Sequence, residues 1–584
     1  MKFSLGPGVS RRWMQGFGVL AVGVAALSVS AQDFDRLKPK EPEARPGRVE
    51  TPTEKPVSMA PDADKPLVAA LRGALFVASP AEVKKAGAPV FDGIRTEKLG
   101  LLEMESFQAV ARAHLGKPVS RASLNAMVRE VIQHYRKCDR PVVDVVVPEQ
   151  DITNGVVQLV VLEGHVGQVR VEENRWFSTK RIAEQVRLRP GDPISERALK
   201  DDVDWLNTNP FRTVDAVFTP GKDRGQTDVV LKAKDRFPVR FYTGYEDTGN
   251  DLTGDERWLA GFNWGNAFDL DHQLNYQFTT SSDFKKLTGH SGSWVIPLPW
   301  RHRLTFFGSR ADTVGDVAPP LNLKGFSWQT SVRYAAPLPA PAWLTHEASA
   351  GFDFKQSNNN LEFGGAQIYG TTTDVDQFVF DYTATARDAY GATSLTGEFV
   401  YSPGGWTPRN FDQNFVAARA GALAEYRYGK ASLERVTQLP WDFSWMAKGA
   451  FQVAHGNLLA SEQFGVGGFS SVRGYDEREA NGDEGYLVST EIRTPPVSLG
   501  AGVGLDSAVD QLQFLGFFDY GAAENRRLLP GEDPHVQLAS AGPGVRYAIA
   551  PWLSVRFDYG WQLYDTGLNP RYNSRGHLGV VIAY

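Results

Sequence analysis

From Phe237 to the carboxyl terminus, the sequence consists of segments of about ten residues in which apolar and polar side chains alternate. In "LSVRFDYGWQL", residues 553–563, every odd position is apolar or aromatic, and the even positions carry Ser, Arg, Asp, Gly and Gln. Because successive side chains of a strand point to opposite faces, each segment has one apolar and one polar face. A soluble sandwich would bury the apolar face, but so many strands with aromatic residues near their ends are typical of a barrel with lipid outside and water inside.

We expect roughly 16 such segments, an even number at which a sheet closes on itself without free edges. They begin near Val239, Arg257, Leu270, Leu287, His302, Phe326, Thr345, Val375, Thr393, Phe415, Phe443, Tyr486, Gln511, Val536, Trp552 and Gly576. The sequence therefore predicts a mainly β protein in which residues 237–584 form a transmembrane antiparallel β-barrel of about 16 strands. The mean hydropathy of -0.31 is compatible with this prediction, because only every second residue of a barrel strand faces lipid.

Residues 1–31 have the pattern of an export signal. Lys2 and Arg12 precede an apolar run over residues 13–29, which ends in small residues. No later stretch of about 18 apolar residues predicts a transmembrane helix. The single cysteine, Cys138, precludes an internal disulfide, and the net charge of -6 provides no basic surface for nucleic acid. We infer a bacterial envelope protein.

Residues 32–65 are rich in proline, lysine and glutamate and are predicted to be an extended linker. Two stretches then repeat each other: "GKPVSRASL" at residues 116–124 and "GDPISERAL" at residues 191–199. In each copy a serine, Ser120 or Ser195, is placed to cap the start of a helix, flanked by the apolar pair of a hydrophobic staple.

Each copy also has an earlier helix, near residues 107–115 or 179–188, and ends in two strands. The order β-α-α-β-β predicts two small α+β domains, residues 66–164 and 165–236, each with a sheet under two helices. A sheet of this size has an exposed edge, which can accept an extended peptide as an added strand.

The stretch "GVGGFSSVRGYDERE", residues 465–479, lies between two predicted strands and contains Arg473. Its glycines permit a loop to fold back sharply into a confined space. A guanidinium away from bulk water needs an anion, because an unpaired buried charge costs several kcal/mol. In "QLQFLGFFDYGAA", residues 511–523, period-two counting places Phe517 and Asp519 on the more polar, inward face.

These residues resemble the outer-membrane transporters of two-partner secretion, of the haemolysin/haemagglutinin secretion-activation type. These transporters belong to a superfamily that also contains the barrel-assembly insertases. The resemblance covers nearly the whole chain after the signal: two repeats similar to POTRA domains 1 and 2, the barrel, and two short motifs. The loop motif is Val472, Arg473, Gly474 and Tyr475. The barrel-wall motif is Phe517, Asp519 and Gly521.

In that family the loop reaches into the barrel and its arginine binds the aspartate of the wall motif. The resemblance therefore implies that Arg473 pairs with Asp519, with Tyr475 and Phe517 packed nearby. Family members usually carry a plug helix after the signal, but "QDFDRLKPKEPEARP" at residues 32–46 offers at most two turns before a proline. A conventional plug is therefore not expected.

The resemblance implies an outer-membrane translocator with its POTRA domains in the periplasm. Such a protein captures an unfolded partner polypeptide, haemolysin- or adhesin-like, and secretes it through the barrel. Its other partners would be outer-membrane lipid and lipopolysaccharide, and the barrel-assembly machinery that inserts it; no nucleic acid is expected. The alternative on the same scaffold is an insertase of outer-membrane proteins, and a passive porin or receptor is a further alternative.

No catalytic, cofactor-binding or metal-binding residues are expected. The glycine-rich run lacks the Gly-Lys-Ser/Thr of a phosphate loop, and the 10 histidines form no convincing ligand cluster. A barrel can carry an enzyme at its rim, but no spacing here indicates a catalytic triad. Arg556 and Asp558, both on an inward face, could instead pair with each other and leave Asp519 free.

Overall fold

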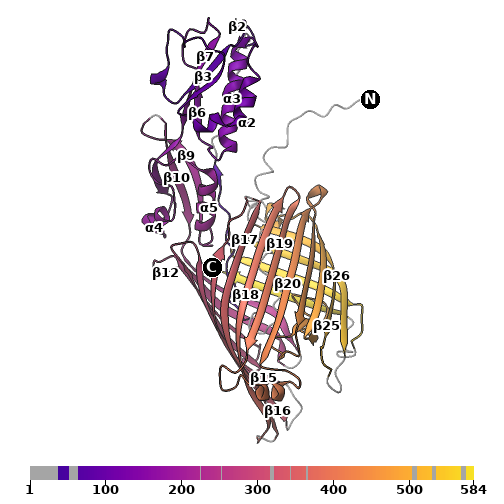
Figure 1. The fold of residues 1–584 in the computed structure, drawn as a ribbon. Coiled ribbons are helices and arrows are strands. Elements are labelled where there is room, and N and C mark those ends of the chain that lie inside the picture. Colours follow the sequence, from indigo (N-terminus) through magenta and orange to yellow (C-terminus); the bar gives the residue numbers. More distant parts are fainter. Residues whose placement is uncertain are drawn as a thin grey trace, which may run out of the picture. The chain divides into compact units, whose positions relative to one another are not determined.

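The computed structural model describes residues 37–50, 63–223, 225–250, 253–315, 321–341, 343–363, 366–502, 510–528, 534–566 and 574–584. These residues form two compact units, both drawn in Figure 1. One unit runs from Ala44 to Phe237, and the other joins the segment that ends at Glu43 to Pro238–Tyr584. The predicted signal peptide and residues 32–36 and 51–62 of the predicted linker lie outside the described residues.

The first α+β repeat is a four-stranded sheet with two helices packed against it. The sheet has the order β4 (Gly93–Glu97), β3 (Gly73–Val77), β7 (Val156–Glu163), β6 (Val143–Val146). The helices are α2 (Glu105–Arg112) and α3 (Arg121–Lys137). The predicted cap is confirmed, because the Ser120 hydroxyl accepts a hydrogen bond from the N–H of Ser123 at the start of α3. Short elements complete the repeat: β2 (Pro66–Val68), β5 (Val119–Ser120), η1 (Pro80–Glu82) and η2 (Gly100–Glu103).

The second repeat has the predicted order of elements. It consists of β8 (His165–Glu172), α4 (Thr179–Glu184), α5 (Glu196–Leu206), β9 (Arg212–Pro220) and β10 (Gln226–Asp235). Ser195 caps α5 by accepting from the N–H of Ala198, as predicted. Helix α4 is shorter than predicted. After Glu184, the N–H groups of Gln185 and Val186 bond to carbonyl oxygens three residues back, and the N–H of Arg187 donates to Asp202 of α5 at 2.8 Å.

In the described part of the chain, a 16-stranded antiparallel sheet closes into a barrel. Figure 1 shows this barrel. The last strand pairs with the first, with Tyr242 opposite Ala583. The strands are β11 (Val239–Asn250), β12 (Gly254–Ala267), β13 (His272–Thr280), β14 (Leu287–Pro297), β15 (Arg303–Gly315), β16 (Leu321–Pro337), β17 (Leu344–Phe363), β18 (Ala366–Asp388), β19 (Gly391–Pro403), β20 (Glu425–Gln438), β21 (Ser444–Ala454), β24 (Glu484–Arg493), β25 (Asp510–Glu524), β26 (His535–Ile549), β27 (Leu553–Gln562) and β28 (Ser574–Ala583).

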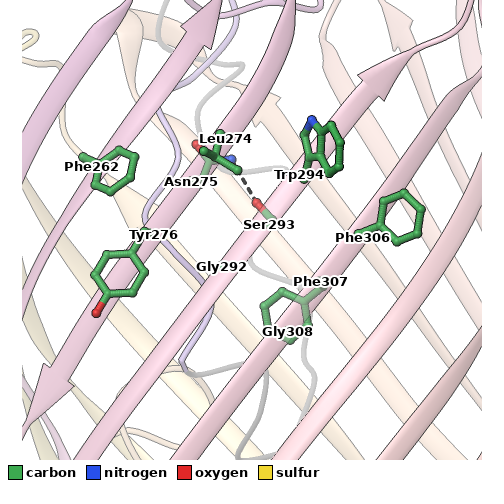
Figure 2. A pocket seen from close by; sticks show the side chains of 10 residues that line it. All are labelled: Phe262, Leu274, Asn275, Tyr276, Gly292, Ser293, Trp294, Phe306, Phe307 and Gly308. Carbon is green, nitrogen blue, oxygen red and sulfur yellow. Dashed lines mark hydrogen bonds between the residues drawn. The ribbon is translucent and has the colours of Figure 1, made fainter. Parts of the chain in front are cut away.

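The two faces of the wall differ as the alternation predicts. On β25, Phe514 and Phe518 are 49% and 42% exposed on the outer surface, whereas Asp519, the residue after Phe518, is fully buried inside. An apolar hollow of about 560 Å³ lies on the outer face of β12–β15 (Figure 2). Gly292 and Gly308 leave part of it without side chains, and the aromatic rings of neighbouring strands line the rest.

One predicted strand is wrong. The segment near Phe415 is not part of the wall but forms the short helix α6 (Asp412–Ala418) in the connection between β19 and β20. Phe415 is fully buried there, in an apolar cluster with Tyr426 and Leu458, so its hydrophobicity serves packing inside the barrel unit rather than contact with lipid. The strand after β17 was predicted to begin near Val375, but β18 begins earlier, at Ala366.

Two further short elements lie in the connections, η3 (Pro440–Asp442) and α7 (Leu499–Gly502). None of the helices that the structure describes has both the length and the apolar character needed to cross a bilayer.

Candidate functional site

The connection between β21 and β24, residues 455–483, is a long loop that folds back against the inner face of the wall. We call it the inner loop. It contains a small hairpin, β22 (Phe464–Val466) with β23 (Ala480–Gly482), and its tip carries the predicted motif. Gly474 adopts a φ of 90°, and a Cβ there would lie 2.7 Å from a carbonyl oxygen of β27. Glycine at this position therefore lets the tip approach the wall closely.

The structure brings Arg473 and Asp519 together in a buried, two-pronged ion pair. The Nε of Arg473 donates to Oδ2 of Asp519 at 2.7 Å, and its Nη2 donates to Oδ1 at 2.8 Å. The main-chain N–H of Arg473 donates to the same carboxylate at 3.1 Å. Arg473 is 2% exposed and Asp519 is fully buried. This fork geometry fixes both the position and the orientation of the loop tip.

Arg473 also binds two carboxylates on other strands. Its Nη1 lies 2.7 Å from Oε1 of Glu491 on β24 and 3.4 Å from Oδ1 of Asp558 on β27. The ring of Phe517 lies under the guanidinium, with its centroid 3.6 Å from the central carbon. Burial opposes the charge of Arg473, but the three carboxylates outweigh burial and raise its pKa above the ordinary value for arginine.

The acids around Arg473 have further cations of their own. Glu491 binds Arg493 at 2.6 Å, and Asp558 binds Arg546 and Arg556 at 2.9 and 2.7 Å. Arg556 and Asp558 therefore do form the ion pair that the sequence left as an alternative. It does not leave Asp519 free, because that carboxylate binds Arg473.

The other motif residues lie around the ion pair. Val472 is buried in an apolar cluster of loop and wall side chains. The hydroxyl of Tyr475 lies 2.8 Å from the carbonyl oxygen of Tyr564 and 3.0 Å from that of Ala539. A Cβ at Gly521 would lie 3.1 Å from a methyl group of Val472, so the glycine makes room for the loop on the wall.

The inner loop has a second buried anchor that the sequence reasoning missed. Glu462 is fully buried, and its Oε1 lies 3.0 Å from Nζ of Lys355 on β17. The hydroxyl of Tyr428 on β20 donates to Oε2 of Glu462 at 2.8 Å. Period-two counting could have identified Lys355 as inward-facing, because it alternates with the aromatic residues of "FDFKQ".

A third anchor joins the inner loop to the connection that contains α6. Arg419 forms an ion pair with Asp483, and its Nη2 donates to Asn525 at 2.9 Å. No sequence signal links these positions, because they lie in connections without alternation. Glu491 was also missed, although the inward period on β24 would have indicated it.

Among the described residues, no group of three or more His, Cys, Asp or Glu side chains could hold a metal ion. The candidate site at the tip of the inner loop is held by ion pairs and hydrogen bonds. It consists of non-covalent contacts that fix a loop against the inside of the wall, and such contacts can open and re-form.

Comparisons with known proteins relate most of the chain to one family. The family model described as "Haemolysin secretion/activation protein ShlB/FhaC/HecB" matches residues 225–547, more than half of the chain. The model "POTRA domain, ShlB-type" matches residues 90–164.

Two curated relatives and one solved structure are similar over most of their length. The heme/hemopexin transporter protein HuxB of Haemophilus influenzae is 22% identical over 465 residues, 76% of this chain and 77% of the relative. The outer membrane transporter CdiB-2 of Burkholderia pseudomallei is 22% identical over 472 residues, 77% of this chain and 75% of the relative.

The structure of CdiB from Escherichia coli matches with a TM-score of 0.69 at 17% identity, over 91% of this chain and 93% of that chain, which shows a shared fold. The matched family models span both the barrel and a POTRA domain. The chain therefore belongs to the haemolysin secretion/activation (ShlB/FhaC/HecB) family of two-partner secretion, and it is an outer-membrane transporter with periplasmic POTRA domains rather than an enzyme.

Proposed function

We propose that this chain captures an unfolded partner polypeptide, haemolysin- or adhesin-like, through its POTRA domains and secretes it through the barrel. The observation that carries the proposal is that the inner loop is held inside the barrel by ion pairs. A loop fixed by charges can move aside for a passing chain and then return. The motif residues are proposed to set this docked position: Val472, Arg473, Gly474, Tyr475, Phe517, Asp519 and Gly521.

Capture by strand addition is supported by a contact within the second repeat. The linker residues of β1 (Val49–Glu50) pair in parallel with β9, at the edge of the sheet, with Val49 opposite Ala216. The N–H of Ala216 donates to the carbonyl oxygen of Arg48 at 2.8 Å. This edge accepts an extended segment through main-chain hydrogen bonds, which is the mode proposed for the client.

The rim from which the inner loop starts follows from the connectivity. The chain enters the barrel from the periplasmic POTRA domains, so an odd number of strands brings it to the opposite, surface-facing rim. The inner loop follows the eleventh barrel strand, β21, and therefore folds inward from that rim. The proposed partners in the membrane are lipid and lipopolysaccharide against the outer apolar face, and the barrel-assembly machinery that inserts the closed sheet.

Export in a strain that lacks this transporter tests the proposal. The candidate partner is a large secreted protein encoded by the neighbouring gene. Restoring the intact chain should restore secretion of that protein, and a chain without residues 67–236 should conduct ions in planar bilayers but export nothing. If other outer-membrane proteins fail to assemble in the deletion strain while the neighbour's product is secreted normally, the chain is an insertase instead.

A further inference from the structure

The segment Leu37–Glu43 belongs to the barrel unit and lies against the inner faces of β11, β13 and β14. We call this segment the leader. Ser291 of β14 donates a hydrogen bond to the carbonyl oxygen of Leu37. Leu37 itself packs over Gly289, where a Cβ would lie only 2.8 Å from its side chain. A glycine in the wall thus makes room for the leader.

The main chain of Lys40 is bound from both sides. Its N–H lies 3.0 Å from the hydroxyl oxygen of Tyr242 and 3.2 Å from Oε1 of Gln277. Nη1 of Arg240 donates to its carbonyl oxygen at 3.1 Å. We call the four wall residues that bind leader main chain the main-chain track: Arg240, Tyr242, Gln277 and Ser291.

The leader also has side-chain anchors beside the track. Oε1 of Glu41 accepts from Asn275 at 2.8 Å and from Ser293 at 3.1 Å, and Nζ of Lys40 lies 2.7 Å from Glu246. Asn275 also donates a hydrogen bond to Ser293 on the neighbouring strand at 2.9 Å. Figure 2 shows this contact as a dashed line. Asn275 and Ser293 alternate with residues of the outer hollow, so one stretch of wall has an apolar outside and an amide- and hydroxyl-lined inside.

These two kinds of contact differ in what they select. The Glu41 and Lys40 side-chain contacts require the leader's own residues. The contacts of the main-chain track require only an extended backbone with a free N–H and carbonyl at the right spacing, which every unfolded polypeptide offers. Prolines at positions 39 and 42 hold the leader in such an extended conformation.

We propose that the main-chain track is a binding site for extended polypeptide, occupied by the leader at rest and by successive segments of the exported protein during transport. The inference rests on the proposed function, because it assigns the passing chain to that site. Few hydrogen bonds act at one time, so each segment is held weakly and can move on. The leader is the resident occupant because of its added side-chain anchors.

Channel block by synthetic peptides tests the track without requiring a known partner. The full chain carrying Lys40→Ala and Glu41→Ala, which weakens the leader's anchors, is placed in planar bilayers. Three peptides are then added: residues 37–43, a version with alanine at every position except the prolines, and residues 37–43 with an N-methyl group on the amide of Lys40.

The first two peptides should both reduce the single-channel current. The concentration that blocks half of the current should be about tenfold higher for the N-methylated peptide than for the unmodified one, because the N-methylated amide cannot donate to Tyr242 or Gln277. Gln277→Leu in the same background should weaken block by both active peptides by about tenfold. Gln329→Leu, a buried glutamine on the inner face of β16, is the matched control and should leave block unchanged.

Three results would overturn the proposal. Block by the native peptide but not by its alanine version would make the site a latch specific for the leader. Equal potency of the N-methylated peptide, or unchanged block in Gln277→Leu with normal gel migration of the unheated barrel, would show that main-chain contacts do not bind the chain. The proposed function fails separately, when the neighbour's product is not exported by the intact chain although the peptides behave as expected.

Discussion

Replacing Arg473 by alanine should release the inner loop while the barrel stays assembled. At an effective dielectric of about 20, two opposite charges 2.7 Å apart attract by about 6 kcal/mol before desolvation is counted. The three carboxylates do not lose the same amount of stabilisation, because Glu491 and Asp558 still pair with other arginines. Within the described residues, Asp519 pairs with no other cation, so the loss falls on this buried carboxylate.

Removing one partner of a buried pair costs about 3–5 kcal/mol. The docked population of the loop should therefore fall by about two to four powers of ten relative to the released one. Asp519→Asn in the Arg473→Ala background removes the unpaired charge. The double variant should consequently be less impaired than the sum of the single variants, with a coupling energy of about 2 kcal/mol or more.

Cysteine labelling measures the position of the loop. Val472→Cys in a Cys138→Ser background places a thiol at a fully buried position of the loop tip, which maleimide reaches only when the loop is released. Arg473→Ala should speed this labelling by at least a hundredfold and sharply reduce export of the partner, while heated and unheated samples still migrate differently on a denaturing gel.

The matched control is Arg435→Ala, because Arg435 pairs with Asp388, whose side chain is 52% exposed. That pair should contribute no more than about 1 kcal/mol, and labelling should not change. If Arg473→Ala labels no faster than the control and exports normally, or if its effect and that of Asp519→Asn simply add, the ion pair does not hold the loop.

Three other changes test separate contacts. Gly474→Ala puts a Cβ 2.7 Å from a β27 carbonyl oxygen at a φ of 90°, so loop labelling should rise in an intact barrel. Glu462→Gln, which removes the carboxylate bound to Lys355, should also raise it. Burial opposes ionisation of Glu462, but Lys355 holds the pKa of this carboxyl below its ordinary value. The stabilisation by this pair should therefore be present at neutral pH and lost as the pH falls through the lowered pKa. The unfolding temperatures of wild type and Glu462→Gln should accordingly differ at neutral pH and converge in acid. Val49→Asp should release β1 from β9, which faster hydrogen exchange at the amide of Ala216 would reveal, while β10 amides remain protected.

Features encoded by neighbours along the chain could be predicted from the sequence. The helix caps at Ser120 and Ser195 depend on residues within one turn, and both form as expected. The inward face of β25 follows from strict alternation, which places Asp519 on the face opposite Phe518. The prediction of a wall strand near Phe415 was wrong because connections inside the barrel also bury apolar residues, without any contact with lipid.

Contacts between distant parts of the chain could not be predicted in the same way. The resemblance implied one carboxylate for Arg473, whereas the structure adds Glu491 and Asp558. The whole leader was expected to belong to the extended linker of residues 32–65, yet residues such as Lys40 lie in the barrel unit against β11 and β13. Their proline-rich composition indicates an extended backbone but not the surface on which it lies.

The sequence by itself determined that this chain builds a closed sheet with an apolar outside and a polar inside, because a strand's period of two converts residue order directly into faces. Only the tertiary structure decided which further inward charges, those of Glu491 and Asp558, meet Arg473. Closure of the barrel brings β24, β25 and β27 around one loop tip, and a buried arginine is stabilised by whichever carboxylates that closure places within about 4 Å. Alternation is local, whereas electrostatic pairing depends on distances that exist only after the sheet has closed.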